Sequence, residues 1–207
     1  MSNSPTQLDA VEIHGMTRQS FMLRGALAAG AVYGAGAVGP FVRQALAQDG
    51  GGDVDVLNFA LTLEYLEAAF YQEAAKIDGL SDQALEYVET FGDEEQQHVD
   101  TLSNTIMQLG GKPVKAPGVD FGDLSSEKAF LKLAVTFEDT GVSAYNGAAP
   151  SIKSKEVLAA AGSIVQVEAR HAAAIRLLAK EAPAPEAFDE TLSKSQVLKA
   201  VKPFVKA

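Results

Sequence analysis

An all-α protein is what the sequence predicts: an antiparallel four-helix bundle with a long crossover after its second helix and a short C-terminal helix. Apolar residues recur at helical spacing through most of residues 53–183, and no alternating, strand-like run competes with them. Two short turns and one long segment rich in Gly, Pro and Asp divide this region into four helices. A Glu-x-x-His motif occurs once in each half, which indicates a duplicated helical hairpin.

The first hairpin has recognisable start and stop signals. Asp53 is expected to cap the first helix, and Gly79 to end it. Ser81 is expected to cap the second helix, which stops at the glycine pair 110–111. Residues 111–125 show no long apolar period and are therefore expected to form the crossover.

The second hairpin repeats this organisation. Its first helix is expected to start at Ser125 or Ser126 and to end near residues 147–150, which contain Gly and Pro. Its second helix is expected to run from Ser154 to residue 183. Two short turns and one long crossover place the helices of each hairpin antiparallel to each other.

The duplicated motif carries the candidate metal ligands. Each Glu-x-x-His is preceded, 31 and 30 residues upstream, by another glutamate, and two of the three histidines in the chain lie in these motifs. A single Glu-x-x-His is most often a solvated helix face, whereas the double pattern supplies ligands for two metals inside a bundle. The six candidate ligands are Glu64, Glu95, His98, Glu138, Glu168 and His171.

Helix geometry allows these groups to meet. Glu64 lies 15 residues before Gly79 and Glu95 lies 16 residues after it, so both are about 22–24 Å from the turn. The same count around Ile152 places the second pair of glutamates opposite each other. Residues i and i+3 share one helix face, so each histidine joins its glutamate.

Two further glutamates are rivals for these positions. Glu67 competes with the first ligand, but its counterpart in the second hairpin is Gly141. Glu94 competes with its neighbour in the motif, but its counterpart is Val167. The six residues named above are the ones that have partners in both halves.

Two tyrosines follow the hairpin glutamates by seven residues. Tyr71 and Tyr145 therefore lie on the same side as the ligands, two turns further along each helix. They are candidates for catalytic roles, either by hydrogen bonding to a ligand carboxylate or as redox-active tyrosines. The alternative is that they are core aromatics whose hydroxyls find any acceptor. Nearby charged residues, Asp100, Asp139 and Arg170, are expected to be surface or helix-pair charges, and Arg170 is the best candidate among them to support a ligand.

Composition narrows the function classes. The formal charge of −10 and the lack of a basic stripe argue against nucleic-acid binding. Cysteine is absent, which leaves oxygen and imidazole as metal donors. Four carboxylates and two imidazoles suit two iron or manganese ions, with iron favoured, better than magnesium or calcium.

Three parts are expected along the chain. Residues 1–47 are predicted to be an export leader, residues 48–183 the bundle, and residues 184–207 a partly helical tail. For the tail we expect one of two roles: packing across the end of the bundle or mediating a homodimer. Its short helix is expected around residues 192–201, with Leu198 among the apolar residues available.

The leader combines a basic segment (17–24), an apolar stretch rich in Ala and Gly, and a small-x-small site at 45–47. It resembles a twin-arginine export signal, although Gln19 stands where the second arginine belongs. A periplasmic or extracellular location is expected, with no stable membrane span after the leader is removed. An uncleaved anchor or an ordinary helix is the alternative.

Three segments carry a family resemblance, 57–67 (LNFALTLEYLE), 145–150 (YNGAAP) and 168–172 (EARHA). Over residues 53–182 the chain resembles the ferritin-like superfamily, which includes ferritin, bacterioferritin, rubrerythrin and manganese catalase. It is most similar to exported bacterial ferritin-like proteins related to plant desiccation-associated proteins. The resemblance implies the ferritin-like connectivity. It also implies terminal roles for the hairpin glutamates and the histidines, and bridging roles for Glu95 and Glu168.

These observations lead to one main functional expectation and two alternatives. The first is a dinuclear oxidase, ferroxidase or catalase-like enzyme that acts on dioxygen or peroxide in stress protection. The second is a non-enzymatic stress- or desiccation-associated protein whose metals brace the fold. The third is an iron-storage protein.

Overall fold

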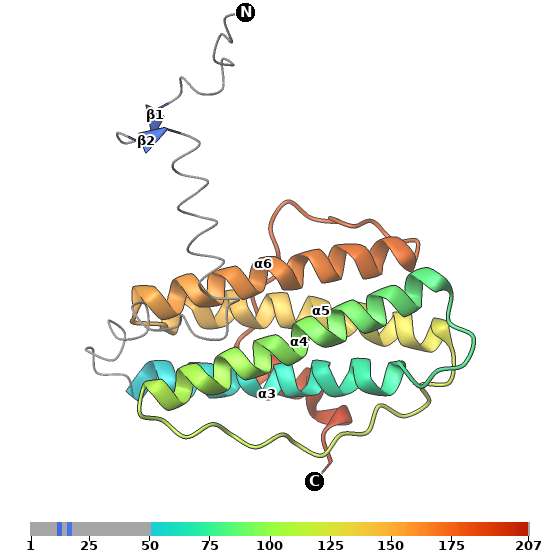
Figure 1. The fold of residues 1–207 in the computed structure, drawn as a ribbon, viewed down its shortest axis with the longest axis horizontal. Coiled ribbons are helices and arrows are strands. Elements are labelled where there is room, and N and C mark those ends of the chain that lie inside the picture. The colour runs from blue at the N-terminus through green and yellow to red at the C-terminus, as the bar shows by residue number, and fades with distance from the viewer. Residues whose placement is uncertain (1–11, 14–15, 18–50, 207) are drawn as a thin grey trace, which may run out of the picture. The chain divides into compact units, whose positions relative to one another are not determined.

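In the computed structural model, which describes residues 12–13, 16–17 and 51–206, four long helices form a bundle (Figure 1). Helices α3 and α4 make one antiparallel hairpin, and α5 and α6 make the other. This confirms the predicted all-α bundle. The bounds of the long helices are Gly51–Ala74 (α3), Asp82–Gln108 (α4), Glu127–Ala148 (α5) and Lys155–Leu178 (α6).

Two short strands belong to a separate unit of the chain. Strand β1 (Glu12–Ile13) pairs in antiparallel fashion with β2 (Met16–Thr17). The rest of the predicted leader lies outside the described residues. No helix in the described part of the chain is long and apolar enough to cross a membrane.

Serine side chains start three of the long helices, as the sequence predicts. Each hydroxyl oxygen accepts a hydrogen bond from the backbone N–H three residues later, which satisfies one of the unpaired donors of the first turn. At the start of α5 the cap is the second of the two candidate serines. The three caps are Ser81, Ser126 and Ser154.

Asp53 does not cap its own helix, so that prediction is wrong. Helix α3 already begins at Gly51, and the buried Asp53 carboxylate points to the start of α6 instead. It accepts hydrogen bonds from the backbone N–H groups of Lys153 (2.7 Å) and Ser154 (2.9 Å). The carboxylate thereby satisfies donors at the N-terminus of a helix 100 residues away in sequence and joins the two hairpins.

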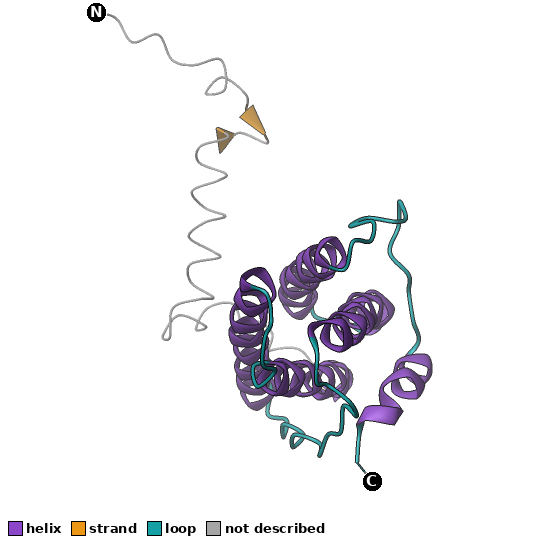
Figure 2. Cartoon of the chain, turned by 90° about the vertical axis from the view of Figure 1, so that its right-hand side faces the viewer, coloured by secondary structure: helices purple, strands orange, loops and turns teal. Residues whose placement is uncertain are grey.

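The C-terminal tail packs along α5 and the crossover. Helix α7 (Lys194–Val201) and the short 3₁₀ helix η3 (Lys202–Phe204) lie beside the bundle (Figure 2). Val197 of α7 is fully buried, whereas Leu198, which the sequence offered, is 43% exposed. The tail therefore packs along the side of the bundle and not across its end, and the homodimer stays a prediction.

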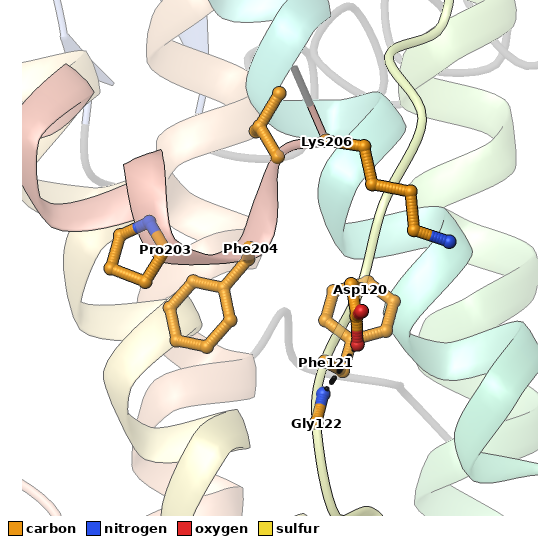
Figure 3. A pocket seen from close by; sticks show the side chains of 7 residues that line it. Asp120, Phe121, Gly122, Pro203, Phe204 and Lys206 are labelled. Carbon is orange, nitrogen blue, oxygen red and sulfur yellow. Dashed lines mark hydrogen bonds between the residues drawn. The ribbon is translucent and has the colours of Figure 1, made fainter.

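The end of the tail is paired with the crossover. The backbone N–H of Asp120 donates to the carbonyl of Phe204 (2.9 Å), and the N–H of Lys206 donates to the carbonyl of Gly118 (2.8 Å). The crossover also places Phe121 in the core, which its composition did not predict. The residues at this junction line a surface hollow between the crossover and η3 (Figure 3).

Two apolar layers enclose a polar layer at mid-bundle. One is built around Phe70, Phe130 and Phe137, and the other around Leu61 and Ile106. Along α4 and α6, the buried glutamates and histidines fall between residues of these two layers. The core thus seals the polar layer from both ends.

Replacing Asp53 with Ala is expected to destabilise the fold by about 2 kcal/mol, because the buried N–H of Ser154 and the part-buried N–H of Lys153 lose their acceptor. Urea denaturation of the metal-free protein measures this. Asp55→Ala, an exposed change on the same helix, is the matched control. Equal denaturation midpoints for the two variants would show that the bond joining the hairpins adds nothing.

Candidate metal centre

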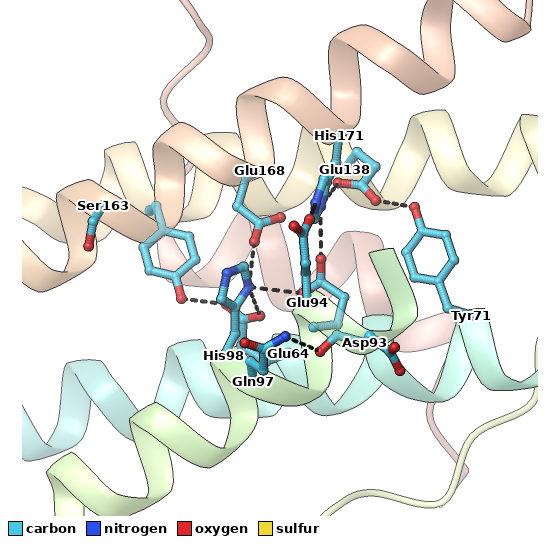
Figure 4. Close-up of polar contacts among 12 residues, drawn as sticks. Glu64, Tyr71, Asp93, Glu94, Gln97, His98, Glu138, Ser163, Glu168 and His171 are labelled. Atoms are coloured by element: carbon cyan, nitrogen blue, oxygen red, sulfur yellow. Dashed lines mark hydrogen bonds and ion pairs between the residues drawn. The ribbon is translucent and has the colours of Figure 1, made fainter. Parts of the chain in front are cut away.

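All six side chains that the sequence selected meet in the polar layer (Figure 4). Each of the four long helices contributes, and the four glutamates have no exposed surface. Helix α3 supplies one of the six and α5 another, while α4 and α6 each supply the glutamate and histidine of a Glu-x-x-His motif. The set is Glu64 on α3, Glu95 and His98 on α4, Glu138 on α5, and Glu168 and His171 on α6.

The six residues form two overlapping groups of four. In each group, one ligand atom from every residue lies within 4.8 Å of the others. Glu95 and Glu168 belong to both groups. The first group is completed by Glu64 and His98, and the second by Glu138 and His171. This arrangement is compatible with two metal ions held side by side and sharing two carboxylates.

Both imidazoles turn the same nitrogen towards the centre. Nδ1 of His98 lies 3.2 Å from carboxylate oxygens of Glu64 and Glu95, and 3.1 Å from Glu168. Nδ1 of His171 lies 3.0 Å from Glu95 and 3.6 Å from Glu138. The carboxylates therefore surround two nitrogen donors, which gives each group one imidazole.

Unpaired polar atoms show that this layer fits cations. Among the described residues, buried oxygens of Glu95, Glu138 and Glu168 and Nδ1 of His171 have no hydrogen-bond partner. Buried carboxylates are costly unless they are paired, protonated or bound to metal. Two divalent cations would satisfy these atoms and offset the charge of four carboxylates, and the oxygen and imidazole donors suit iron or manganese.

In the metal-free protein, protonation of some of the ligand groups reduces the repulsion among the buried carboxylates. Burial raises the pKa of Glu64 to about 7, although the hydrogen bond from His98 works against it. Burial also acts to raise the pKa of Glu95, but the neighbouring imidazoles of His171 and His98 outweigh it and lower that pKa to about 2. For His171, burial favours the neutral ring, yet the neighbouring carboxylates of Glu138 and Glu95 raise its pKa to about 11.

The tyrosines link the two halves reciprocally. The Tyr71 hydroxyl on α3 donates to Glu138 on α5, and the Tyr145 hydroxyl on α5 donates to Glu64 on α3. Burial, followed by the charge of the neighbouring glutamate, raises the pKa of both phenols well above the ordinary value. Each tyrosine therefore stays protonated and fixes the glutamate of the opposite hairpin.

Glu94 contacts the centre in a way that the sequence did not predict. Its carboxylate lies 2.6 Å from Nε2 of His171, so it accepts a hydrogen bond from the outward nitrogen of that ring. Phe91 stacks on the same ring, with centroids 4.0 Å apart. A histidine that donates its outer N–H to a carboxylate is held in one tautomer and orientation. The motif spacing gave no signal for this contact, because it joins α4 to α6.

Arg170 is a surface charge, as the sequence leads us to expect, and it does not support the ligands. Its side chain is exposed, and no hydrogen bond from it to another described residue is found. Arg176, one turn and a half further along α6, instead pairs with Asp139 on α5 at 2.5 and 3.1 Å. This ion pair braces the second hairpin beside the centre.

Comparison with known proteins identifies the family of this chain. Residues 52–181 match the family described as ferritin-like domain. The chain belongs to this family. The ferritin-like superfamily resemblance is thereby confirmed, while the relation to exported and desiccation-associated members stays a prediction.

A solved structure shares the ferritin-like fold. It is described as a crystal structure of ferritin like, diiron-carboxylate proteins from Bacillus anthracis str. Ames. The two chains are 22% identical with a TM-score of 0.56, and the match covers 63% of this chain and 97% of that one. At this identity the likeness shows the fold alone. No curated protein matches the chain.

Metal binding is expected to tighten as the pH rises from 6 to 8 and to release protons. Below its pKa of about 7 Glu64 is protonated in the metal-free protein, and His171 keeps its proton up to about pH 11, so bound metal must displace both. Titration calorimetry with Mn(II) in buffers of different ionisation enthalpy measures the released protons. A pH-independent affinity without proton release would contradict the protonation of the cluster.

Glu94→Ala is expected to weaken Mn(II) binding by about 10- to 100-fold, because His171 loses the carboxylate that orients its ring. Competition with a chelator measures the affinity. Glu89→Ala, an exposed change on the same helix, is the matched control. An unchanged affinity in Glu94→Ala would mean that the stacked Phe91 ring suffices to hold His171.

Proposed function

We propose that this protein binds two iron or manganese ions, with iron favoured. With these ions it would act as an oxidase or peroxide-handling protein in stress protection. One observation carries the proposal: two four-residue groups of buried ligands share Glu95 and Glu168. A donor set of this kind, with shared carboxylates between two positions, is suited to a metal pair. The diiron-carboxylate description of the structural neighbour supports the same metal class.

The residues divide into the roles that the resemblance implies. Glu64 and His98 would be terminal ligands of one ion, and Glu138 and His171 of the other, with the shared glutamates as bridges. The two proposed ions have equal sets of ligands, because each receives one imidazole and one carboxylate of its own in addition to the two shared carboxylates. Two iron or manganese ions in such a site supply the two electrons that dioxygen or peroxide accepts.

The chain's own groups prepare the site for this chemistry. The apolar layers on both sides keep water from the buried carboxylates, and a dry environment strengthens the interaction of charges inside it. Tyr71 and Tyr145 each hold a terminal glutamate through a hydroxyl proton. We assign them this positioning role, and a redox role would require an added electron-transfer step.

The site of action is proposed from the sequence pattern. Residues 1–47 would serve as the export leader, which places the mature bundle outside the cytoplasm. Dioxygen and peroxide as small-molecule substrates need no docking surface, so the buried centre suffices for them. A homodimer remains compatible with this proposal.

The decisive test is metal content measured by ICP-MS on protein purified from its native compartment. We expect about two iron or manganese ions per chain and their loss in Glu95→Ala/Glu168→Ala, because both positions lose their shared carboxylates. Glu73→Ala/Glu89→Ala, with two exposed helix positions changed, is the control. The metal identified then selects a ferroxidase or a catalase-like assay.

The outcomes separate the proposal from the structural alternative. Stoichiometric metal with turnover of dioxygen or peroxide supports the enzyme. Stoichiometric metal that raises thermal stability without turnover would favour a structural protein. Wild-type protein without stoichiometric metal would overturn the dinuclear assignment itself.

A further inference from the structure

A fifth buried glutamate lies beside the metal centre, outside the two groups of four ligands. Glu67 lies on α3 one turn after Glu64 and one turn before Tyr71, on the same helix face. Its side chain is only 3% exposed. Within the described part of the chain, no hydrogen bond or ion pair to its carboxylate is found. A buried carboxyl group without a partner is costly, so its retention in the core calls for a function.

Gly141 on α5 makes room for this carboxylate. A Cβ added at Gly141 would lie 3.0 and 3.6 Å from the two carboxylate oxygens of Glu67, and 3.2 Å from an oxygen of Glu168. The missing side chain thus leaves a space that the carboxylates of Glu67 and of one shared glutamate both border. In the duplicated sequence, Gly141 is also the counterpart of Glu67, so one half supplies the carboxylate and the other supplies the space.

The balance between the charges of the metal ions and those of the carboxylates determines when Glu67 can bind to the centre. The four glutamates of the two ligand groups offset the four positive charges of two divalent ions when the imidazoles are neutral. A fifth carboxylate has no charge to balance in that state. If one or both ions are trivalent, the pair exceeds the four carboxylates by one or two positive charges, and a buried carboxylate nearby then has a strong electrostatic partner.

We propose that Glu67 is a fifth carboxylate ligand of the centre, seated by Gly141, which selectively stabilises a metal pair that contains trivalent ions. This inference rests on the proposed function, because it requires the dinuclear site. It adds a preference for charge state that the six-ligand set alone does not provide. It also makes the two metal positions inequivalent, since only one half of the duplication carries the extra glutamate.

Two metal probes, used without oxygen or peroxide, test this preference without turnover. Mn(II) is the divalent probe, and Ga(III), delivered as its nitrilotriacetate complex, is the trivalent probe. We expect Glu67→Gln, which keeps the side-chain shape, to weaken Ga(III) binding at least about tenfold, with Mn(II) stoichiometry and affinity close to those of the wild type. Glu73→Gln, an exposed residue on α3 paired with Lys76, is the matched control and should change neither.

A glycine substitution gives an independent check. Gly141→Ala is expected to weaken Ga(III) binding as Glu67→Gln does, and Mn(II) binding as well, because its Cβ crowds both Glu67 and Glu168. Gly162→Ala on α6 is the control, since its Cβ would meet nothing within 4 Å. Circular dichroism on each variant establishes that the helices are intact.

The results distinguish this inference from the function on which it rests. Wild-type protein that binds two Mn(II) ions, together with Glu67→Gln that keeps the wild-type affinity for Ga(III), would overturn the role of Glu67 and leave the dinuclear site standing. Equal weakening of both probes in Glu67→Gln would overturn the charge-state preference. Wild-type protein that binds no stoichiometric Mn(II) would overturn the proposed function and this inference with it.

Discussion

Burial of four carboxylates in one layer of the bundle is the constraint on which the rest of the structure depends. Each of these glutamates has lost all contact with solvent, and charges removed from water must be paired, protonated or bound to metal. The two histidines, the two tyrosine hydroxyls and the proposed cations all meet this requirement. The apolar layers above and below make it more severe, because they exclude the water that would otherwise solvate the charges.

The internal duplication explains how one chain builds such a layer, and its exceptions explain why the two halves differ. The pairs from Tyr71 to Glu138 and from Tyr145 to Glu64 repeat each other across the bundle. At two other places the repeat fails. Glu94 orients one histidine, and Glu67 lies against Gly141. Related halves with different supporting residues give two metal positions with different surroundings.

Contacts far from the centre keep its four helices in place. Asp53 fastens the start of α3 to the start of α6. The tail lies along α5, where the backbone N–H of Leu192 donates to the carbonyl of Ser143. The carbonyl of Leu192 occupies the space that a side chain at Gly147 would fill. A ligand set drawn from four helices needs such contacts, because a shift of one helix would displace its ligands relative to the other three.

The sequence by itself determined the helices, their order and the six residues that converge, because helical periodicity, serine caps and motif spacing are local signals. It also placed both tyrosines beside the ligands. Only the tertiary structure decided which groups touch across the bundle: Asp53 at α6, Glu94 at His171, Glu67 at Gly141, and Val197 in the core. These contacts join helices that are distant in sequence, and their partners depend on how the helices pack, which no local pattern encodes.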